Sequence, residues 1–367
     1  MLLSAPNLLA NLVEPAVGVL GDAWDRRALV RAGGVAFAAA LLLVALGDGF
    51  LPLLAALTLL SPASGAFVGL SQATLMDVDP GARERNMARW ALAGSVGMVG
   101  GPLVVGAATA LGVGWRATFA LLAVPAVLAL IAISGSWPAG NWPARNWPAR
   151  NWPAGTPHHG RHDTATRDRP PLGAALARGA RDVAAALGRG EVLRWLILLE
   201  LADLLLDVLH AYLALYFMDV VGTGGAGAGI AVAAWTGVGL LGDALLIPLL
   251  ARVSGIRYLR ASALMVLVAF PSFLLVRGIG AKLVLLALLG LLNAGWYAIL
   301  KGRLYAAMPG RSATVMAVGN VFGLAGSLLP LTVGLVADRI GLAGAMWLLL
   351  LAPVALLVGL PRRPAGE

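Results

Sequence analysis

The stretch GVLGDAWDRRALVR, residues 18–31, ends one long apolar segment and begins the next, and three of its last six residues are arginines. The chain holds eleven such apolar segments, and all but four of its 27 lysines and arginines lie in every second gap or at the C-terminus. The four exceptions are Arg116, Arg277, Lys282 and Arg339. Because cytoplasmic loops of membrane proteins collect lysine and arginine, this alternation predicts membrane spans and fixes their direction.

The lengths of the apolar segments agree with this reading, since runs of about 20 residues match a hydrocarbon core of about 30 Å. We expect helical spans at about 2–21, 28–47, 52–76, 88–110, 115–134, 192–217, 225–251, 257–277, 281–306, 312–337 and 342–360. The basic gaps are 26–31, 83–89, 136–191, 252–260, 301–311 and 362–363. Five spans precede the long gap and six follow it, so the first span starts outside and the C-terminus is cytoplasmic.

Composition excludes several other classes of protein. Hydrophobic residues make up 59% of the chain and charged residues 12%, whereas a soluble domain has about 25% charged residues. The net charge of +9 is spread over single arginines in loops, which suits an anionic inner leaflet and argues against nucleic acid as a partner. The absence of cysteine excludes disulfides, thiolate metal sites and cysteine nucleophiles. No enzyme signature is present, so we predict neither an enzyme nor a cofactor.

A long polar loop, residues 136–190, separates the two sets of spans. It begins with four near-identical pentads, SWPAG, NWPAR, NWPAR and NWPAG, whose regular prolines block helix formation. We interpret them as a duplicated linker whose tryptophans rest at the membrane interface, and a motif read by an aromatic-binding partner is the alternative. We expect no metal site at the linker histidines, His158, His159 and His162.

The two halves of the chain repeat each other with an offset of about 230 residues. PGARERNMA, residues 80–88, resembles PGRSATVMA, residues 309–317. Each is followed by a helix proline, Pro102 or Pro330, with glycine four residues further on. Such repeats are typical of transporters built from two parallel bundles. We therefore expect an N-terminal bundle at 1–135, a cytoplasmic linker at 136–190 and a C-terminal bundle at 191–367.

Two motifs resemble a known family, the major facilitator superfamily. GVLGDAWDRR, residues 18–27, resembles its loop 2–3 signature, although Ala23 and Asp25 depart from that pattern. GMVGGPLVVG, residues 97–106, resembles its helix 5 antiporter signature, with Val105 in place of a glycine. The matching helix 5 residues are Gly97, Gly101, Pro102 and Gly106. They would give a thin, bent surface for close packing at the interface of the bundles, although local packing alone also explains the glycines.

The resemblance covers the whole chain except the family's first helix. Six-plus-six topology needs one more span before residue 2, since the first span here ends in the signature that normally closes helix 2. The resemblance thus implies an all-α fold of two bundles with eleven helices, five plus six, lacking helix 1. We expect the natural start to lie upstream, and loss of helix 1 is the alternative.

The resemblance also implies a gate on the cytoplasmic side. In the family the loop 2–3 acid is thought to lie by the N-terminus of helix 11, which here begins near 311–314. A carboxylate there meets the positive end of the helix dipole. A signature arginine would pair with an acid at the inner end of helix 4, and the signature glycine would permit close helix approach. The predicted gating residues are Asp22, Arg26, Arg27, Asp77, Asp79 and Gly18; the alternative is ordinary solvated loop charges.

Acidic residues within the spans indicate proton coupling. ELADLLLDVLH, residues 200–210, places three acids and a histidine within about 80° on one helix face. A carboxylate at the bilayer centre costs about 2.5–3.5 kcal/mol, so such a stripe must face the protein interior. Glu14 and Asp243 occupy similar depths in the two halves. The predicted coupling residues are Asp203, Asp207, Glu200, His210, Glu14 and Asp243; a packing network without transport chemistry is the alternative.

Other polar or aromatic residues of the spans are weaker candidates for substrate contact. Lys301 is the one lysine that we place a turn or two inside a span, where it would bind an anionic group or a carboxylate of the 192–217 span, or reach the inner surface. The predicted cavity residues are Asn11, Gln72, Asn293, Trp296, Tyr297 and Lys301.

These observations support three readings of function. The first is a monomeric secondary transporter that exports a small organic compound in exchange for protons by alternating access. The second is uptake by proton symport or facilitated diffusion, and the third is a membrane scaffold or sensor without transport. The substrate stays open. A chain rich in alanine, glycine and arginine is typical of GC-rich bacteria, which predicts the inner membrane as its location.

Overall fold

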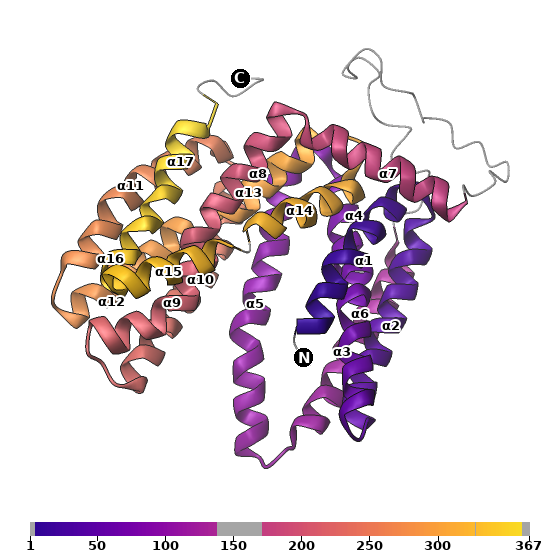
Figure 1. Cartoon of the computed structure of the whole chain (residues 1–367), viewed down its shortest axis with the longest axis horizontal. Coiled ribbons are helices and arrows are strands. Elements are labelled where there is room, and N and C mark those ends of the chain that lie inside the picture. Colours follow the sequence, from indigo (N-terminus) through magenta and orange to yellow (C-terminus); the bar gives the residue numbers. More distant parts are fainter. Residues whose placement is uncertain (1–3, 138–170, 327, 362–367) are drawn as a thin grey trace. The chain divides into compact units, whose positions relative to one another are not determined.

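The computed structural model describes residues 4–137, 171–326 and 328–361, and in these ranges every regular element is a helix (Figure 1). Nine helices of the described part are long and apolar enough to cross a membrane. The described residues of the spans expected at 2–21 and 192–217 are also helical, but these two spans are not among the nine. The linker pentads from residue 138 onward, the three linker histidines, Arg362 and Arg363 lie outside the described residues.

The chain forms two compact units that do not follow the order of the sequence. Unit 1 comprises Met1–Val78, Val113–Ala184 and Pro309–Ala317. Its elements are α1 (Ser4–Ala23), α2 (Arg26–Leu46), α3 (Phe50–Ser64), the π-helical turn η1 (Gly65–Gly69), α4 (Leu70–Val78), α6 (Trp115–Ser136), α7 (Leu172–Leu187) and the start of α14 (Ser312–Gly326). α2 packs against α3 and α6, and Leu41, Ala123 and Ala126 form a small core there.

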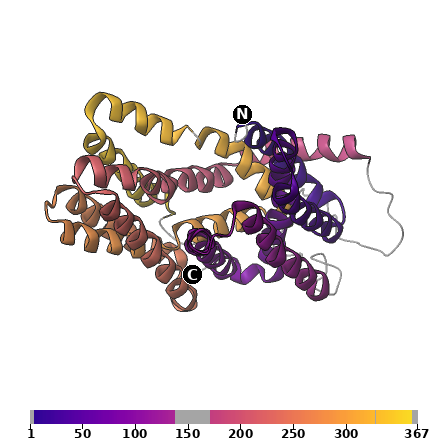
Figure 2. The same cartoon turned by 90° about the horizontal axis from the view of Figure 1, so that it is seen from below.

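Unit 2 comprises Asp79–Gly112, Ala185–Met308 and Val318–Glu367. Its first helices are η2 (Pro80–Ala82), α5 (Arg83–Ala110), α8 (Gly190–Asp203), η4 (Leu204–Val208), α9 (Leu209–Leu215), η5 (Tyr216–Val220) and α10 (Gly225–Leu249). The others are α11 (Gly255–Leu275), α12 (Ile279–Asn293), α13 (Trp296–Ala307), the rest of α14, α15 (Leu329–Ile340), α16 (Leu342–Ala345), η6 (Met346–Leu350) and α17 (Leu351–Gly359). α5 packs against α10 and α13, and Figure 2 shows the helices from below. The bundles expected at 1–135 and 191–367 stay a prediction.

Glycine and proline mark the places where long helices change geometry. α3 holds Pro62, and it passes at Gly65 into the π-helical turn η1 before α4 continues. Gly295 separates α12 from α13 with a φ of 85°, a left-handed conformation that a side chain disfavours. These breaks leave backbone groups available to side chains of neighbouring helices.

Many large apolar side chains face outward. Leu111, Val268 and Val358 are exposed by 79%, 70% and 82%. A water-soluble protein rarely exposes so many large apolar side chains, whereas lipid accepts them. The chain is therefore an integral membrane protein.

Lys282, one of the four basic residues outside the basic gaps, is buried rather than set in a loop. Its Nζ donates hydrogen bonds to the Tyr216 hydroxyl at 3.0 Å and to the carbonyl oxygens of Phe273 and Leu274 at 2.7 and 3.2 Å. It also lies over the Tyr216 and Phe273 rings, 5.2 and 5.0 Å from their centres. The lysine therefore caps the C-terminus of α11.

We expect Lys282→Met to lower the free energy of unfolding by about 1–3 kcal/mol, because the Tyr216 hydroxyl and the last carbonyls of α11 lose their donor while still buried. The measurement is the thermal unfolding midpoint of the purified protein in detergent. Arg277→Met, at an exposed site nearby, is the matched control and should change stability by no more than about 0.5 kcal/mol. Equal midpoints for both variants would contradict the capping role.

Candidate functional site

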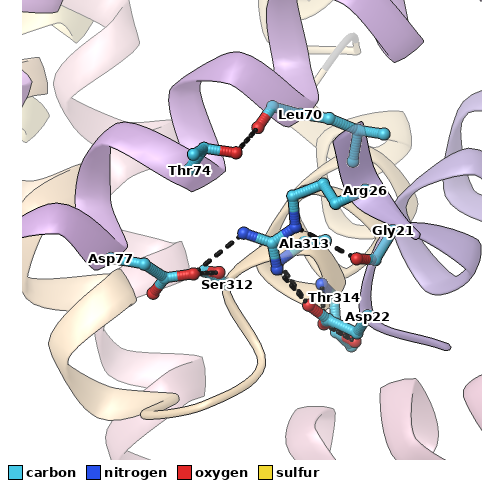
Figure 3. Close-up of polar contacts among 9 residues, drawn as sticks. All are labelled: Gly21, Asp22, Arg26, Leu70, Thr74, Asp77, Ser312, Ala313 and Thr314. Atoms are coloured by element: carbon cyan, nitrogen blue, oxygen red, sulfur yellow. Dashed lines mark hydrogen bonds and ion pairs between the residues drawn. The ribbon is translucent and has the colours of Figure 1, made fainter. Parts of the chain in front are cut away.

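The turn between α1 and α2 brings an acid and an arginine together in unit 1. Asp25 caps α2 by accepting a hydrogen bond from the Arg27 amide at 3.0 Å, so the chain turns within two residues after α1. Arg26 then reaches back to α1. Its Nη2 lies 2.7 Å from Asp22 Oδ1, and its Nε donates to the Gly21 carbonyl at 3.0 Å (Figure 3).

The Asp22 carboxylate caps the N-terminus of α14. It accepts hydrogen bonds from the Ala313 amide at 3.1 Å, from the Thr314 amide at 2.7 Å and from the Thr314 hydroxyl at 2.7 Å. The first turn of a helix leaves such amides unpaired and carries the positive end of the dipole. One side chain therefore satisfies several donors of α14 and holds that helix against α1.

Asp77, near the end of α4, completes the cluster. Its Oδ2 lies 2.9 Å from Arg26 Nη1, and it accepts a hydrogen bond from the Ser312 hydroxyl (Figure 3). The Arg26 and Asp77 side chains are only 15% and 5% exposed. Arg26 thus bridges two carboxylates that both also contact the start of α14. We call Asp22, Arg26, Asp77, Ser312 and Thr314 the Asp22 latch.

Small residues allow this close contact of α1 with α14. A Cβ at Gly18 would lie 2.8 Å from the Ala313 carbonyl oxygen and 3.0 Å from the Ala317 amide nitrogen. Such distances mean that the two helices touch backbone to backbone at Gly18. A larger side chain there would force α14 away from the Asp22 carboxylate.

Two of the predicted gating residues lie elsewhere. Arg27 donates to the Ser134 carbonyl at 3.0 Å, and Arg31 donates to the same oxygen at 3.2 Å, so both cap the C-terminus of α6. Asp79 accepts from the Gly81 amide at 3.0 Å and caps η2. The sequence reasoning missed Ser312, although a serine directly after PGR, at the start of an expected helix, is a recognisable capping signal.

α7 contacts α1 and the residue that precedes α14. A Cβ at Gly179 would overlap Val19 of α1, so α7 lies directly on that helix. Asp182 of α7 lies 2.9 Å from Arg311, the residue just before α14. The last part of the long linker therefore packs across the end of the latch.

The acids of the stretch 200–210 lie on an interrupted helix in unit 2. Asp203 is the last residue of α8, and Asp207 lies within the π-helical turn η4 that follows. The regular 100° spacing on which the single-face prediction rested therefore does not continue through this segment. Asp203 is half-buried and Asp207 is exposed. The Nδ1 of His210 is buried and has no hydrogen-bond partner among the described residues.

Glu200 and Lys301 lie beside a row of glycines on α14. The Glu200 carboxylate lies against Gly323 and Gly326, and the Lys301 Nζ would be 3.2 Å from a Cβ at Gly319. The missing side chains give both charged groups room beside this helix. An acid and a base thus line the same strip of α14.

Asp243 and Glu14 each lie beside a helix break. Asp243 accepts a hydrogen bond from Ser95 Oγ at 2.5 Å and another from the backbone amide of Gly295, where α12 ends and α13 begins. The Glu14 Cγ would be 3.0 Å from a Cβ at Gly65, where α3 passes into η1. Each acid is therefore placed beside irregular backbone.

The other cavity candidates differ in their surroundings. Trp296 is fully buried and its Nε1 donates to Ser262 Oγ at 2.8 Å, so it packs in the core. The side-chain amide of Asn293 is buried without a hydrogen-bond partner in the described part. Gln72 and Tyr297 are half-buried. The Asn11 side chain lies outside what the structure describes.

The helix 5 glycines face open space in the described structure. α5 remains one helix of 28 residues through Pro102. No described atom lies within 4 Å of a Cβ built at Gly97, Gly101 or Gly106. Close packing of another helix on this face stays a prediction.

The chain is similar to a known protein family and to solved structures of transporters. The model of the Major Facilitator Superfamily matches residues 1–330. FucP, a transporter of that superfamily solved in the outward conformation, is 14% identical with a TM-score of 0.71, covering 98% of this chain and 88% of that chain. A second structure, of the E. coli fucose:proton symporter FucP, is 13% identical with a TM-score of 0.71, covering 98% of this chain and 90% of that chain.

A human protein shows the same fold. The organic anion transporter MFSD10 (TETRAN) is 20% identical with a TM-score of 0.70, covering 97% of this chain and 81% of that chain. No curated protein matches the sequence. At these identities the solved structures show a shared fold and no more.

Proposed function

This chain belongs to the major facilitator superfamily, a family of membrane transporters, and we propose that it is a monomeric secondary transporter that exports a small organic compound in exchange for protons. We propose no enzymatic reaction and no cofactor for it. The observation that carries alternating access is the Asp22 latch. The latch joins residues 22–77 of the first half of the chain to residues 312–314 of the second half by contacts that can break without unfolding either segment.

The chemistry of the Asp22 latch suits a reversible contact. Its charged groups are held by hydrogen bonds and ion pairs, which water can replace when the groups separate, whereas interlocked apolar side chains would resist separation. Arg26 Nη2 lies 2.7 Å from Asp22 Oδ1. Because both residues flank the α1–α2 turn, this ion pair can keep the carboxylate oriented when α14 moves away. We infer that the latch closes the cytoplasmic side and opens as the two halves move.

Asp203 and Asp207 are the proposed proton carriers. They lie in the span that we propose for residues 192–217, and an ionised carboxylate at the centre of a bilayer costs about 2.5–3.5 kcal/mol. Taking up a proton removes that cost, so protonation and movement of the segment become coupled. The π-helical turn η4, which follows Asp203 and contains Asp207, supports this role, because such turns occur frequently at functional sites.

Glu200 and Lys301 are the proposed polar contacts of the substrate, beside the glycine face of α14. We also propose that the basic gaps and the C-terminus lie in the cytoplasm and that the membrane is a bacterial inner membrane. Among the similar folds, one is a proton symporter and one is an organic anion transporter. Uptake by symport is therefore the second candidate. We place export first because the resemblance of residues 97–106 to the helix 5 antiporter signature favours exchange over symport.

Proton release from vesicles tests this function. The purified protein is reconstituted, and cationic, neutral and anionic organic compounds are added in turn while internal and external pH are recorded. Exchange predicts proton movement opposite to the compound, whereas symport predicts movement in the same direction. If a compound is transported at a rate that does not depend on a pH gradient, proton coupling would be overturned. If the folded protein transports none of the compounds, the transport function itself would be overturned.

A further inference from the structure

Glu200 and Lys301 are opposite charges without a direct partner in the described part of the chain. Glu200 lies on α8 and Lys301 on α13, and both side chains are half-buried. Neither takes part in a hydrogen bond or an ion pair there, although their charges interact at longer range. A charge held away from water is costly unless it is paired. The two side chains can therefore each accept a charged group from outside the chain.

The row of glycines on α14 sets the spacing of these two charges. Gly319, Gly323 and Gly326 follow one another at helical intervals, so they share one face of the helix. A Cβ at Gly319 would lie 3.2 Å from the Lys301 Nζ. The Glu200 Oε1 would lie 3.6 Å from a Cβ at Gly323 and 3.4 Å from a Cβ at Gly326. With a rise of about 1.5 Å per residue, the ammonium and the carboxylate are about 6–10 Å apart along this helix.

This spacing suits a small molecule that carries both kinds of charge. A charge-assisted hydrogen bond spans about 2.8 Å, so two of them leave up to about 5 Å between the charges of a molecule that lies in line between the side chains. An α-amino acid, whose ammonium and carboxylate are separated by one carbon atom, falls within this range. Because the three positions on α14 are glycines, their own side chains take up none of the space.

Asp203 adds negative charge near Glu200. It follows Glu200 by about one turn of α8, and its charge interacts with those of both Glu200 and Lys301. An ammonium group that binds Glu200 therefore also meets the field of Asp203, the proposed proton carrier. Loss of the proton from Asp203 strengthens the attraction for the ammonium group, which is the order of events that exchange requires.

We propose that Glu200 and Lys301 form a zwitterion site, in which Glu200 binds an ammonium group and Lys301 binds a carboxylate of the same small amino acid or amino-acid-like compound. This inference rests on the proposed transport function and names the class of its substrate. A singly charged compound leaves one of the two side chains without a partner, and a site built for a polar group strongly rejects an analogue that lacks it. The zwitterion site therefore selects for the presence of both charges.

Transport of matched compounds tests the zwitterion site. Alanine, leucine and phenylalanine are each compared with two derivatives: the amide, which keeps only the positive charge, and the N-acetyl compound, which keeps only the negative charge. The purified protein is reconstituted in vesicles, and uptake of each labelled compound is measured under a pH gradient. The compounds are added at about pH 6, where the α-amino group is charged. At least one amino acid should be transported about tenfold faster than both of its derivatives.

Two variants assign the two ends of the zwitterion site. Glu200→Gln should remove the advantage of the amino acid over the N-acetyl compound, because the ammonium group has lost its partner. Lys301→Met should remove the advantage over the amide, because the carboxylate has lost its partner. Each ratio is measured in one preparation of vesicles, so it does not depend on the amount of folded protein. Glu191→Gln, at an exposed position at the start of α8, is the matched control and should keep both ratios.

The outcomes separate this inference from the proposed function. The zwitterion site is overturned if no amino acid is transported faster than its two derivatives, or if either variant keeps its ratio. Proton-linked transport of other organic compounds, with none of these amino acids, would also overturn the site but leave the proposed function intact. If the folded protein transports no compound of any kind, the transport function itself is overturned. Amino acid transport at a rate that does not depend on the pH gradient would support the site and overturn proton coupling alone.

Discussion

Asp22→Ala should open the side of the transporter that we propose faces the cytoplasm. It should raise the rate at which a membrane-impermeant maleimide labels a Val315→Cys reporter in inside-out vesicles by about 5- to 30-fold. The substitution removes the acceptor of two backbone amides and one hydroxyl at the start of α14. Loss of a helix cap costs about 0.5–2 kcal/mol, and one or two kcal/mol changes an equilibrium ratio by a factor of about 5 to 30. Arg26 also loses one of its two carboxylates, which adds to the effect.

Asp22→Asn separates the two contributions. Asparagine caps helices about as well as aspartate, but it carries no charge for Arg26 or for the helix dipole. Its labelling rate should therefore fall between those of the wild type and Asp22→Ala. Asp48→Asn is the matched control, because Asp48 is 89% exposed in its ion pair with Arg116 and exposed pairs contribute little.

Labelling of Val315→Cys in Asp22→Ala at the wild-type rate would show that the capping hydrogen bonds do not hold this side closed. A second measurement guards against misfolding. Thermal unfolding in detergent should show that the variant remains folded, since the hydrogen bonds that the substitution removes lie at one end of α14 and not in the core around Leu41.

The double variant Asp203→Asn with Asp207→Asn should lower proton-linked flux about tenfold or more, while membrane insertion and folding are retained. Asparagine has nearly the same volume as aspartate but cannot carry a proton between the two sides of the membrane. Neutral side chains also remove the insertion cost of about 2.5–3.5 kcal/mol for each acid, so stability should not fall.

Counterflow of substrate across the membrane without a pH gradient is the companion measurement. If these acids only couple protons, counterflow should persist while proton movement disappears. Normal proton coupling in both single variants and in the double variant would contradict the assignment. Glu191→Gln, at an exposed position at the start of α8, is the matched acidic control and should behave as the wild type.

The fold could be predicted from the sequence because membrane insertion depends on properties that are local to each segment. Apolar length and the arginines of alternate gaps decide whether and in which direction a segment spans. The all-helical fold and the family, both predicted from the sequence, were confirmed by the structure and by the family match. Lys282 shows the limit of such counting, since its position outside the basic gaps is explained by the carbonyl groups and aromatic rings that surround it in the folded chain.

The candidate sites were less accessible from the sequence. The expected single face of Glu200, Asp203, Asp207 and His210 assumed regular helix, and η4 interrupts it. The spacing of residues in the sequence does not predict a π-helical turn such as η4, because the turn depends on how the neighbouring helices pack. The roles of these residues in coupling stay a prediction.

By itself the sequence determined the class of this protein: a polytopic helical transporter of repeated halves with an acid, Asp22, in a family signature. Only the tertiary structure decided the partners of the charged residues. Arg26 and Arg27 are adjacent and chemically identical, yet one bridges Asp22 and Asp77 while the other caps α6. Glu84 and Arg303 are far apart along the chain, and they lie together only because α5 packs against α13. Spans follow from local transfer free energies, whereas pairing depends on distances that only the packed helices set.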